Sequence, residues 1–304
     1  MNNAILFFFD INAPEIKKIN NNYYFDYLGE NYVVYNYKRD LEEIMEIYYL
    51  NMELLNNGIL GYEIFINKNS DILFMYEKEY YVLMKIPRIK NRIITYNDIV
   101  NFNYIPSMNV KKLDKSNWGF NWANKIDFIE YQFSQMSNKY KIIEESINYF
   151  IGIWENGVSY YNDNNIVSDK KYICHKRVTY DMDLLEFINP MNFVIDYKER
   201  DIGEYLKSYV LNNNYSKDIL NKFLISRSRE SVILLISRVL FPSYYFDLYE
   251  DIILLEKKEE LIKNAIDKRN NVLYLIDFIF EKYKSLNITG IDWIKKEINL
   301  HRSI

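Results

Sequence analysis

The order in which strand-like and helix-like patterns follow each other constrains the fold of this chain more than any single motif does. Up to Pro87, short β-rich runs surround one amphipathic helix, and from Trp118 onward the pattern is mostly helical. Short strands separated by turns and accompanied by one helix favour a small antiparallel sheet with that helix packed on it. The sequence therefore predicts an α+β protein with a small sheet lobe over residues 1–87, a connector over 88–117 and a larger helical lobe over 118–304.

The small lobe is predicted to contain two strands, one helix and three further strands. The run from Asn31 to Tyr37 is rich in residues that favour strands. Asp40 lies three residues before Glu43, which is the spacing of a capping box, and apolar residues then recur at helical intervals until Gly58. The three strands after the helix are expected at residues 62–67, 72–76 and 80–86.

The helical lobe is predicted to contain eight helices, with two short apolar runs between the second helix and the third. The apolar runs are Tyr172–His175 and Phe193–Asp196. Apolar residues at three- and four-residue spacing indicate the helices. The eight helices are expected at residues 122–137, 141–160, 201–211, 217–225, 230–240, 247–264, 272–283 and 292–299.

Composition excludes several classes of function. Lys and Arg together number 38 against 42 Asp and Glu, and this mild negative charge argues against a general nucleic-acid or anionic-membrane binder. One cysteine, Cys174, excludes an intrachain disulfide framework, and two histidines argue against a zinc site. No uninterrupted apolar run reaches the roughly 18 residues that span a membrane. We therefore expect a cytoplasmic protein without membrane insertion and without a nucleic-acid partner.

Two segments resemble the signature segments of the aminoglycoside phosphotransferase and choline kinase-like superfamily. They are YICHKRV (residues 172–178) and NFVIDYKERDIGEYL (residues 192–206). Supporting segments, among them YKRDLEEIMEIYYLNMELLNNG and LFPSYYFDLYEDI, extend the resemblance over most of residues 38–253. The chain is most similar to the bacterial spore-coat branch of that superfamily, of CotS/YutH type. The resemblance implies a bilobal protein-kinase-like fold, a role in spore coat assembly and partners among the coat proteins.

The catalytic loop of that superfamily reads His-x-Asp-x-x-x-x-Asn, and this chain departs from it. Aligned on His175, the loop has Arg177 where the family has its catalytic base and Met182 where it has a metal-binding amide. A guanidinium cannot accept a proton at neutral pH, and a thioether is a poor ligand for Mg²⁺. The resemblance therefore implies a kinase fold with impaired phosphoryl transfer, that is, a pseudokinase.

The remaining family positions are only partly matched. Asp196 corresponds to the metal-binding carboxylate, and the mid-strand position of the phosphate-holding lysine is occupied by Tyr35. Lys38 at the strand end is a shifted candidate for that lysine, with Glu43 or Glu46 as its partner on the helix. Asp196 could equally serve as a turn or capping residue and Lys38 as a solvated one. The sequence has no Gly-rich loop before this strand that would bring backbone amides to a phosphate.

Three functions remain open at this point. The first is a binding or scaffold module with a kinase fold, which needs no cofactor. The second is an active small-molecule phosphotransferase that uses ATP and Mg²⁺, with Asp181 or Asp183 as the base, Asp196 on the metal and Lys38 on the phosphates. The third is an α+β binding protein unrelated to kinases. A salt bridge between Arg177 and Asp196 would fill the metal site with protein and favour the first.

A further aspartate, Asp201, follows Asp196 by only five residues. Its spacing to Glu204 is that of a capping box, so we expect Asp201 to be the N-cap of the next helix. In the superfamily the corresponding interval is longer and helps to form the site for the acceptor substrate. The short interval therefore implies a lost or closed acceptor cleft.

Overall fold

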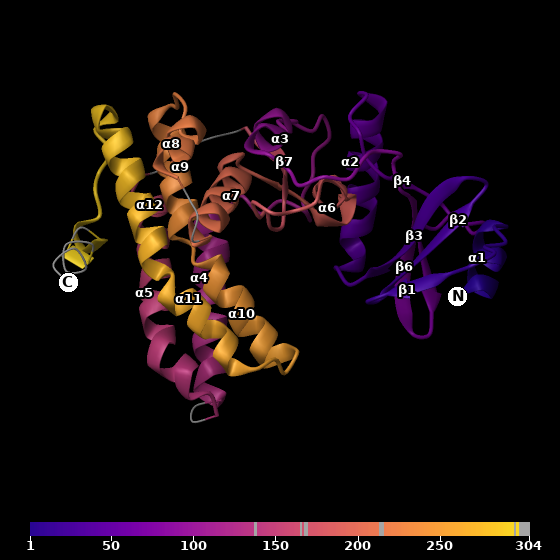
Figure 1. Ribbon diagram of the computed structural model, residues 1–304, viewed down its shortest axis with the longest axis horizontal. Helices are drawn as coiled ribbons and strands as arrows, with labels where there is room; N and C mark the ends of the chain where they lie inside the picture. The colour runs from indigo at the N-terminus through magenta and orange to yellow at the C-terminus, as the bar shows by residue number, and fades with distance from the viewer. Residues whose placement is uncertain (137–138, 165, 167–169, 213–215, 295, 298–304) are drawn as a thin grey trace.

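The computed structural model consists of two lobes of different architecture. Figure 1 shows a sheet lobe that contains the N-terminus at one end of the molecule and a helical lobe at the other. This is the bilobal α+β arrangement that the sequence predicts. The structure describes the whole chain except residues 137–138, 165, 167–169, 213–215, 295 and 298–304.

The small lobe is built on a six-stranded sheet in which all described pairings are antiparallel. The order is β1-β2-β3-β6-β4, and β5 pairs with the same strand β6 as β4 does. The run predicted at residues 62–67 supplies only a two-residue strand. The strands are β1 (Lys17–Ile19), β2 (Asn22–Tyr27), β3 (Glu30–Tyr37), β4 (Glu63–Ile64), β5 (Leu73–Tyr76) and β6 (Glu79–Lys85).

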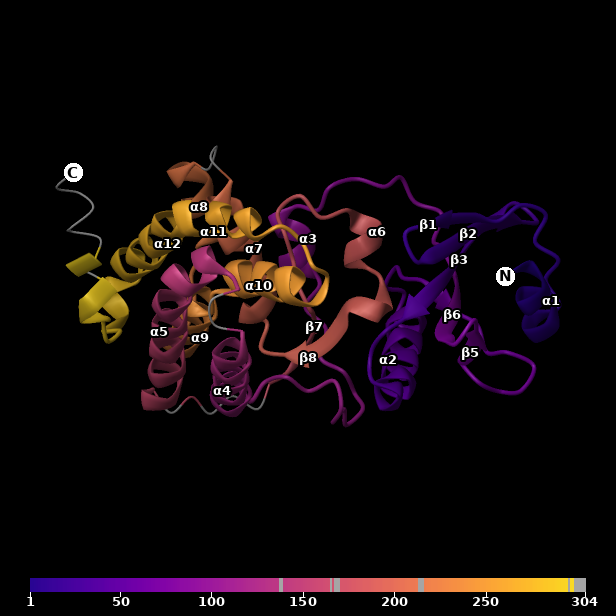
Figure 2. The ribbon, with the colours of Figure 1, turned by 90° about the horizontal axis from the view of Figure 1, so that it is seen from below.

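Successive side chains of β3 face opposite sides of the sheet, and each side is covered by one helix. Val33 belongs to the core shared with α2 (Ile44–Asn56), whereas Val34 belongs to a second core that includes residues of α1 (Asn2–Phe9). Figure 2 shows α2 on the side of the sheet that faces the helical lobe. The sequence predicts α2 but not α1, because α1 is too short to show a helical period.

The start of α2 differs in detail from the predicted capping box. The Asp40 carboxylate accepts a hydrogen bond from the backbone N–H of Glu42, at 3.0 Å, and a 3-10 turn over Leu41–Glu43 leads into the helix. The side chain of Glu43 does not close the box. It is therefore free to take part in the contacts between the lobes described below.

The connector contains a helix that the sequence analysis did not find. This helix, α3 (Tyr96–Asn101), begins with a capping box between Thr95 and Asp98. Farther along, the carboxylate of Glu46 on α2 accepts hydrogen bonds from the backbone N–H groups of residues 111–113. Glu46 thus fixes the connector to the small lobe, which is a structural use of a residue predicted as a partner of Lys38.

In the helical lobe, α7, α9 and α12 pack against one another, α5 packs against α9, and α4 packs against α5. The helix predicted at 247–264 is in fact α10, a 3-10 turn over Glu259–Ile262 and α11. Of the helix predicted at 292–299, residues 292–294 and 296–297 are helical, and residues 295, 298 and 299 lie outside the described part of the chain. The helices are α4 (Trp118–Gln135), α5 (Lys141–Asp163), α6 (Leu184–Phe187), α7 (Glu199–Leu211), α8 (Lys217–Phe223), α9 (Arg229–Leu240), α10 (Ser243–Leu254), α11 (Lys263–Asp267) and α12 (Arg269–Lys282).

The two apolar runs between the helices form a separate two-stranded sheet, as expected. β7 (Tyr172–His175) pairs with β8 (Phe193–Asp196) antiparallel, and Cys174 lies opposite Val194. All four residues of β8 are buried. The hairpin therefore holds the segment after His175 and the carboxylate of Asp196 in fixed positions on the wall of the helical lobe.

One segment, Arg229–Leu254, is long and apolar enough to cross a membrane when only length and composition are considered. It consists of the two core helices α9 and α10, which are separated at Phe241 and Pro242. Within its most apolar window, 78% of the residues are buried inside the protein. Packing in the core of the helical lobe accounts for this apolar content.

Candidate functional site

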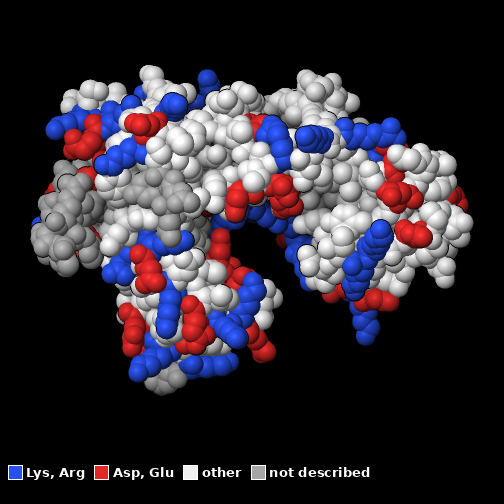
Figure 3. Space-filling view, viewed as in Figure 1, with Lys and Arg blue, Asp and Glu red and all other residues white. Residues whose placement is uncertain are grey.

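The candidate site is a cavity between the two lobes that carries several cations. Its volume is about 270 Å³, and it is lined by the β1–β2 turn, the end of β3, Lys176 and Met191. Lys38 and Arg39 at the end of β3 also line it. Figure 3 shows the hollow between the lobes, with basic and acidic side chains on its walls. The cations Lys38, Arg39 and Lys176 line this cavity and could contact an anionic group.

Arg39, rather than the predicted Lys38, pairs with Glu43 of the small lobe, and it also donates hydrogen bonds to the helical lobe. Arg39 Nε lies 2.6 Å from the Glu43 carboxylate, and its Nη1 donates to the backbone carbonyls of Met191 and Phe193 at 3.0 and 2.8 Å. Lys38 is exposed and has no hydrogen bond or ion pair with any residue that the structure describes. Arg39, and not Lys38, thus forms the ion pair at the start of α2, and the same side chain holds the two lobes together.

Lys176, the residue after the catalytic-loop histidine, carries the most perturbed amine of the cavity. Burial and, to a smaller extent, the neighbouring positive charge of Arg39 lower the pKa of Lys176 to about 8, while the carboxylate of Glu43 acts in the opposite direction. A positive charge in a partly buried place next to other cations is costly, so the amine gives up its proton more readily. This residue was not among the predicted site residues.

The pKa of Lys176 predicts an unusual pH profile of chemical modification. An amine-acylating reagent attacks only neutral amines, so its rate at Lys176 should reach half of its maximum near pH 8. A lysine in an unstructured peptide is the reference, and its rate should still be rising at about pH 10. Mass spectrometry of peptides after short pulses gives both profiles. Identical midpoints for the two lysines would contradict this interpretation of the cavity.

Asp196, the predicted metal ligand, is fully buried and already has three donors. Its carboxylate accepts hydrogen bonds from Trp118 Nε1 at 3.0 Å, from Arg200 Nη1 at 2.7 Å and from the backbone N–H of Tyr197 at 2.7 Å. The exposed fraction of its side chain is 0%. Asp196 thus forms a buried ion pair with an arginine one helical turn farther along the chain.

These residues do not fit a magnesium site in this arrangement. A Mg²⁺ ion needs several hard oxygen ligands, and it would have to displace Arg200 from Asp196 to reach even one of them. Met182, at the position of the family's amide ligand, offers only a thioether side chain. Among the described residues, no group of three or more acidic, histidine or cysteine side chains could hold a metal ion. The predicted role of Asp196 as a metal ligand thus requires Arg200 to leave.

Arg177, at the position of the catalytic base, points to a different partner from the predicted one. Its Nε and Nη2 donate to the two carboxylate oxygens of Asp247 on α10, both at 2.6 Å, and its Nη1 donates to the carbonyl of Lys176. The Asp247 carboxylate raises the pKa of Arg177 above its ordinary value. The salt bridge of Arg177 with Asp196 that would have favoured a scaffold is therefore not formed, and Arg200 is the partner of Asp196.

His175 is buried and orders the loop rather than facing the cavity. Its Nδ1 lies 2.6 Å from one oxygen of the Asp201 carboxylate, and the other oxygen accepts the backbone N–H of His175 at 2.9 Å. The imidazole stacks on Phe187 with 4.1 Å between ring centroids. Asp201 is the third residue of α7, whose N-cap residue is Lys198, so the prediction of Asp201 as the N-cap is wrong.

The two substitute bases lie on exposed parts of the same loop. Asp181 lines another cavity, between α7, α10 and α11, and Asp183 is the N-cap residue of α6. The carbonyl of Met182, between them, accepts a hydrogen bond from the backbone N–H of Ile94 at 2.9 Å. Neither aspartate lines the cavity that contains Lys38, so the structure does not bring the residues of the active-enzyme hypothesis together.

Comparison with known proteins gives one family and one fold. The family model "Spore coat putative kinase YutH" matches residues 2–272. The endospore coat-associated protein YutH of Bacillus subtilis (strain 168) is 26% identical over 248 residues, which is 72% of each chain.

Several solved kinases have a similar fold at low sequence identity. The AMP-bound spectinomycin phosphotransferase is 12% identical with a TM-score of 0.57, and the match covers 92% of this chain and 96% of that one. An amicoumacin kinase is 10% identical with a TM-score of 0.56, covering 90% and 92%. The choline kinase of Streptococcus pneumoniae is 11% identical with a TM-score of 0.51, covering 90% and 95%. At such identities the likeness concerns the fold alone.

Proposed function

This chain belongs to the spore coat YutH family of kinase-like proteins, and on that premise we propose that it is a pseudokinase that acts as a binding or scaffold module in spore coat assembly. It is made in the cytoplasm and acts through contacts with other coat proteins. It requires neither ATP nor Mg²⁺ for this role. The name of its Bacillus subtilis relative, an endospore coat-associated protein, supports the cellular setting.

The buried pair of Asp196 with Arg200 is the observation that carries this proposal. Phosphoryl transfer depends on metal ions that neutralise the developing charge and on a base that orients the acceptor hydroxyl. Here the metal-binding carboxylate is neutralised by an arginine, and the place of the base is taken by Arg177, which is bound to Asp247. One arginine thus occupies the carboxylate that would bind the metal, another stands in the place of the base, and each has a structural partner.

An assay of ATP consumption and a thermal-shift measurement test the proposal together. With millimolar ATP and excess Mg²⁺ we expect no ATP consumption above the blank and no rise in melting temperature. A functional site would be detected, because an ATP concentration of about 100 times the Kd would stabilise the protein by about 2.7 kcal/mol. A choline kinase of the same fold serves as the positive control. Turnover that disappears in the Asp196→Asn variant would overturn the proposal and favour the active phosphotransferase.

The scaffold role has its own test in sporulating cells. Lys38→Met removes the only predicted phosphate-holding lysine, and because Lys38 is exposed we expect the fold to be unaffected. A fluorescent fusion of this variant should reach the spore coat as the wild-type fusion does in a strain without its own copy. Loss of coat localisation in Lys38→Met, at equal protein level, would indicate that phosphate binding at this site matters for function.

A further inference from the structure

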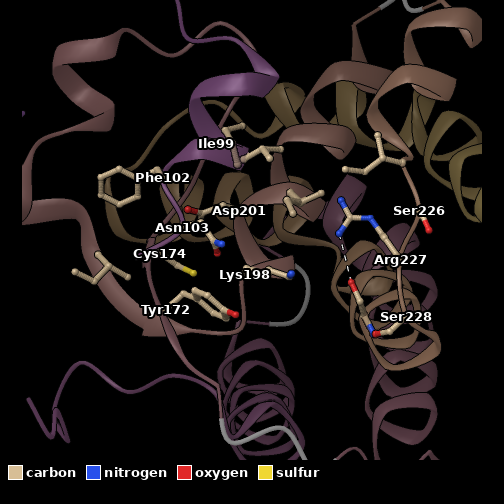
Figure 4. Close-up of a pocket in the computed structure, with 15 residues that line it drawn as sticks. Ile99, Phe102, Asn103, Tyr172, Cys174, Lys198, Asp201, Ser226, Arg227 and Ser228 are labelled. Atoms are coloured by element: carbon tan, nitrogen blue, oxygen red, sulfur yellow. Dashed lines mark hydrogen bonds between the residues drawn. The ribbon is translucent and has the colours of Figure 1, made fainter. Parts of the chain in front are cut away.

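A second cavity, of 310 Å³, lies in the helical lobe, and its residues differ from those of the cavity between the lobes. Figure 4 shows it beside β7, with walls from α3, from the start of α7 and from the segment that leads into α9. One part of its wall is apolar and includes Ile99, Phe102 and the ring of Tyr172. Another part carries Lys198 and Arg227, whose charged ends point into the cavity in Figure 4.

Arg227 is a buried cation that the protein only partly satisfies. The exposed fraction of its side chain is 6%, and its Nε has no hydrogen-bond partner among the described residues. Its other nitrogens donate to the hydroxyl groups of Tyr96, at 3.0 Å, and Ser231, at 3.4 Å. An arginine keeps its charge at any ordinary pH, and a buried donor without a partner is costly. Such a group indicates that an acceptor is missing from the cavity.

The nearby carboxylates are engaged elsewhere. Glu199 comes within 3.9 Å of Arg227, but its carboxylate accepts a hydrogen bond from the hydroxyl of Ser231 at 2.5 Å. Burial raises the pKa of Glu199, whereas the charges of Arg227 and Lys198 act in the opposite direction. Asp201 also lines the cavity, and its two oxygens are bound to His175. Among the described residues, Arg227 thus has one acidic neighbour, at 3.9 Å, and Asp201 forms no ion pair with Lys198 or Arg227.

Two further features of the wall suit an anion. The first turn of the twelve-residue helix α9 begins at Ser228, whose hydroxyl caps the backbone N–H of Ser231 and which itself lines the cavity. A helix N-terminus favours negative charge through its free N–H groups. Lys198 comes from the start of α7 and has no ion pair with a described residue, while its ammonium lies 5.9 Å from the centre of the Tyr172 ring.

We propose that this cavity binds a small organic phosphate. Its phosphate group lies between Lys198, Arg227 and the first turn of α9, and its apolar part contacts Ile99 and Phe102. The combination of a guanidinium, an ammonium and helix N–H groups suits the three oxygens of a phosphate monoester. The apolar wall distinguishes such a ligand from inorganic phosphate. The site is independent of the cavity between the lobes and of phosphoryl transfer there.

Isothermal titration with phenyl phosphate tests the proposal on the full chain. We expect saturable binding with one molecule per chain, weaker binding of inorganic phosphate and none of phenol. The Lys198→Gln variant should bind phenyl phosphate about tenfold more weakly or worse, because a charge-assisted hydrogen bond is lost. The absence of saturable binding at millimolar phenyl phosphate would overturn the proposal.

Three further variants locate the binding site. Arg227→Gln should also weaken binding, and Lys198→Gln covers the case in which the buried Arg227 variant fails to fold. Lys141→Gln, which removes an exposed lysine at the start of α5, should leave the affinity unchanged. Lys176→Gln, which changes the cavity between the lobes, should also leave the affinity for phenyl phosphate unchanged. Binding that is lost in Lys176→Gln but retained in Lys198→Gln would place the phosphate between the lobes and refute the proposal.

Discussion

Replacing Arg200 by Met is expected to lower the free energy of unfolding by about 3–5 kcal/mol, because the carboxylate of Asp196 would then be buried without its counter-charge. The side chain of Asp196 is fully buried, and Arg200 is its only ionic partner among the described residues. Arg200 also donates to the backbone carbonyls of His175 and Lys176 at 2.7 and 3.1 Å. The substitution therefore loosens the catalytic-loop segment as well as the ion pair.

Urea denaturation of matched variants measures this effect. Arg177→Met is the control, since it removes the same kind of side chain from a pair with Asp247 whose members are 37% and 45% exposed. Such an exposed pair is worth about 0–1 kcal/mol. The double variant Asp196→Asn/Arg200→Met should regain part of the lost stability, because no unpaired charge remains. If Arg200→Met costs no more than Arg177→Met, Asp196 does not depend on Arg200 and is available to a metal.

The order of elements in the chain could be predicted because it depends on local patterns. The capping residue Asp40 and the stop at Gly58 enclose the helix of the small lobe, and alternation with turn residues indicates the strands around it. Elements too short for a period were not found, as with β1 and α1. The helix predicted at 247–264 is longer than the observed α10 because the apolar spacing continues in the sequence beyond Leu254, where the helix ends.

The site could be predicted only where partners are close in sequence. Arg200 follows Asp196 by four residues at the start of a helix, and this spacing permits an ion pair. The partner of Arg177 is Asp247, 70 residues away, and nothing in the spacing indicates it. Arg39 takes the role predicted for Lys38 because the direction of a side chain at the end of a strand depends on the hydrogen-bond acceptors that the helical lobe presents to it.

A second buried network lies deeper in the helical lobe and depends on one carboxylate. Glu204 on α7 lies 2.8 Å from both Lys207 Nζ and Arg238 Nε, and it accepts a hydrogen bond from the hydroxyl of Ser243 at 2.8 Å. All these charged groups are buried. Lys207 also donates to the carbonyl of Phe241 at 2.6 Å, where α9 ends and α10 is about to begin. Glu204 thus stabilises the corner between the two most apolar helices.

The Glu204→Gln variant should be destabilised by about 3–5 kcal/mol, since two buried cations lose their counter-charge while the size of the side chain is kept. Glu250→Gln is the matched control, because Glu250 pairs with Lys125 where both side chains are more than a third exposed. Urea denaturation of the two variants should separate them by several kcal/mol. Equal stabilities would show that Lys207 and Arg238 do not need the negative charge.

The free energy of unfolding of the Glu204→Gln variant should depend on pH, whereas an uncharged packing defect would lower it equally at every pH. Burial lowers the pKa of Lys207 to about 7 in the folded protein, against an ordinary value of 10.5, and Glu204 counteracts this lowering. Without Glu204 the folded-state pKa falls further, so Lys207 loses its proton at lower pH and the unfolded chain then binds more protons than the folded one. Stability consequently rises with pH in that window. The deficit of Glu204→Gln against the wild type should be largest in mild acid and become smaller as the pH approaches about 7; a deficit that is constant with pH would mean that Lys207 keeps its proton in both proteins.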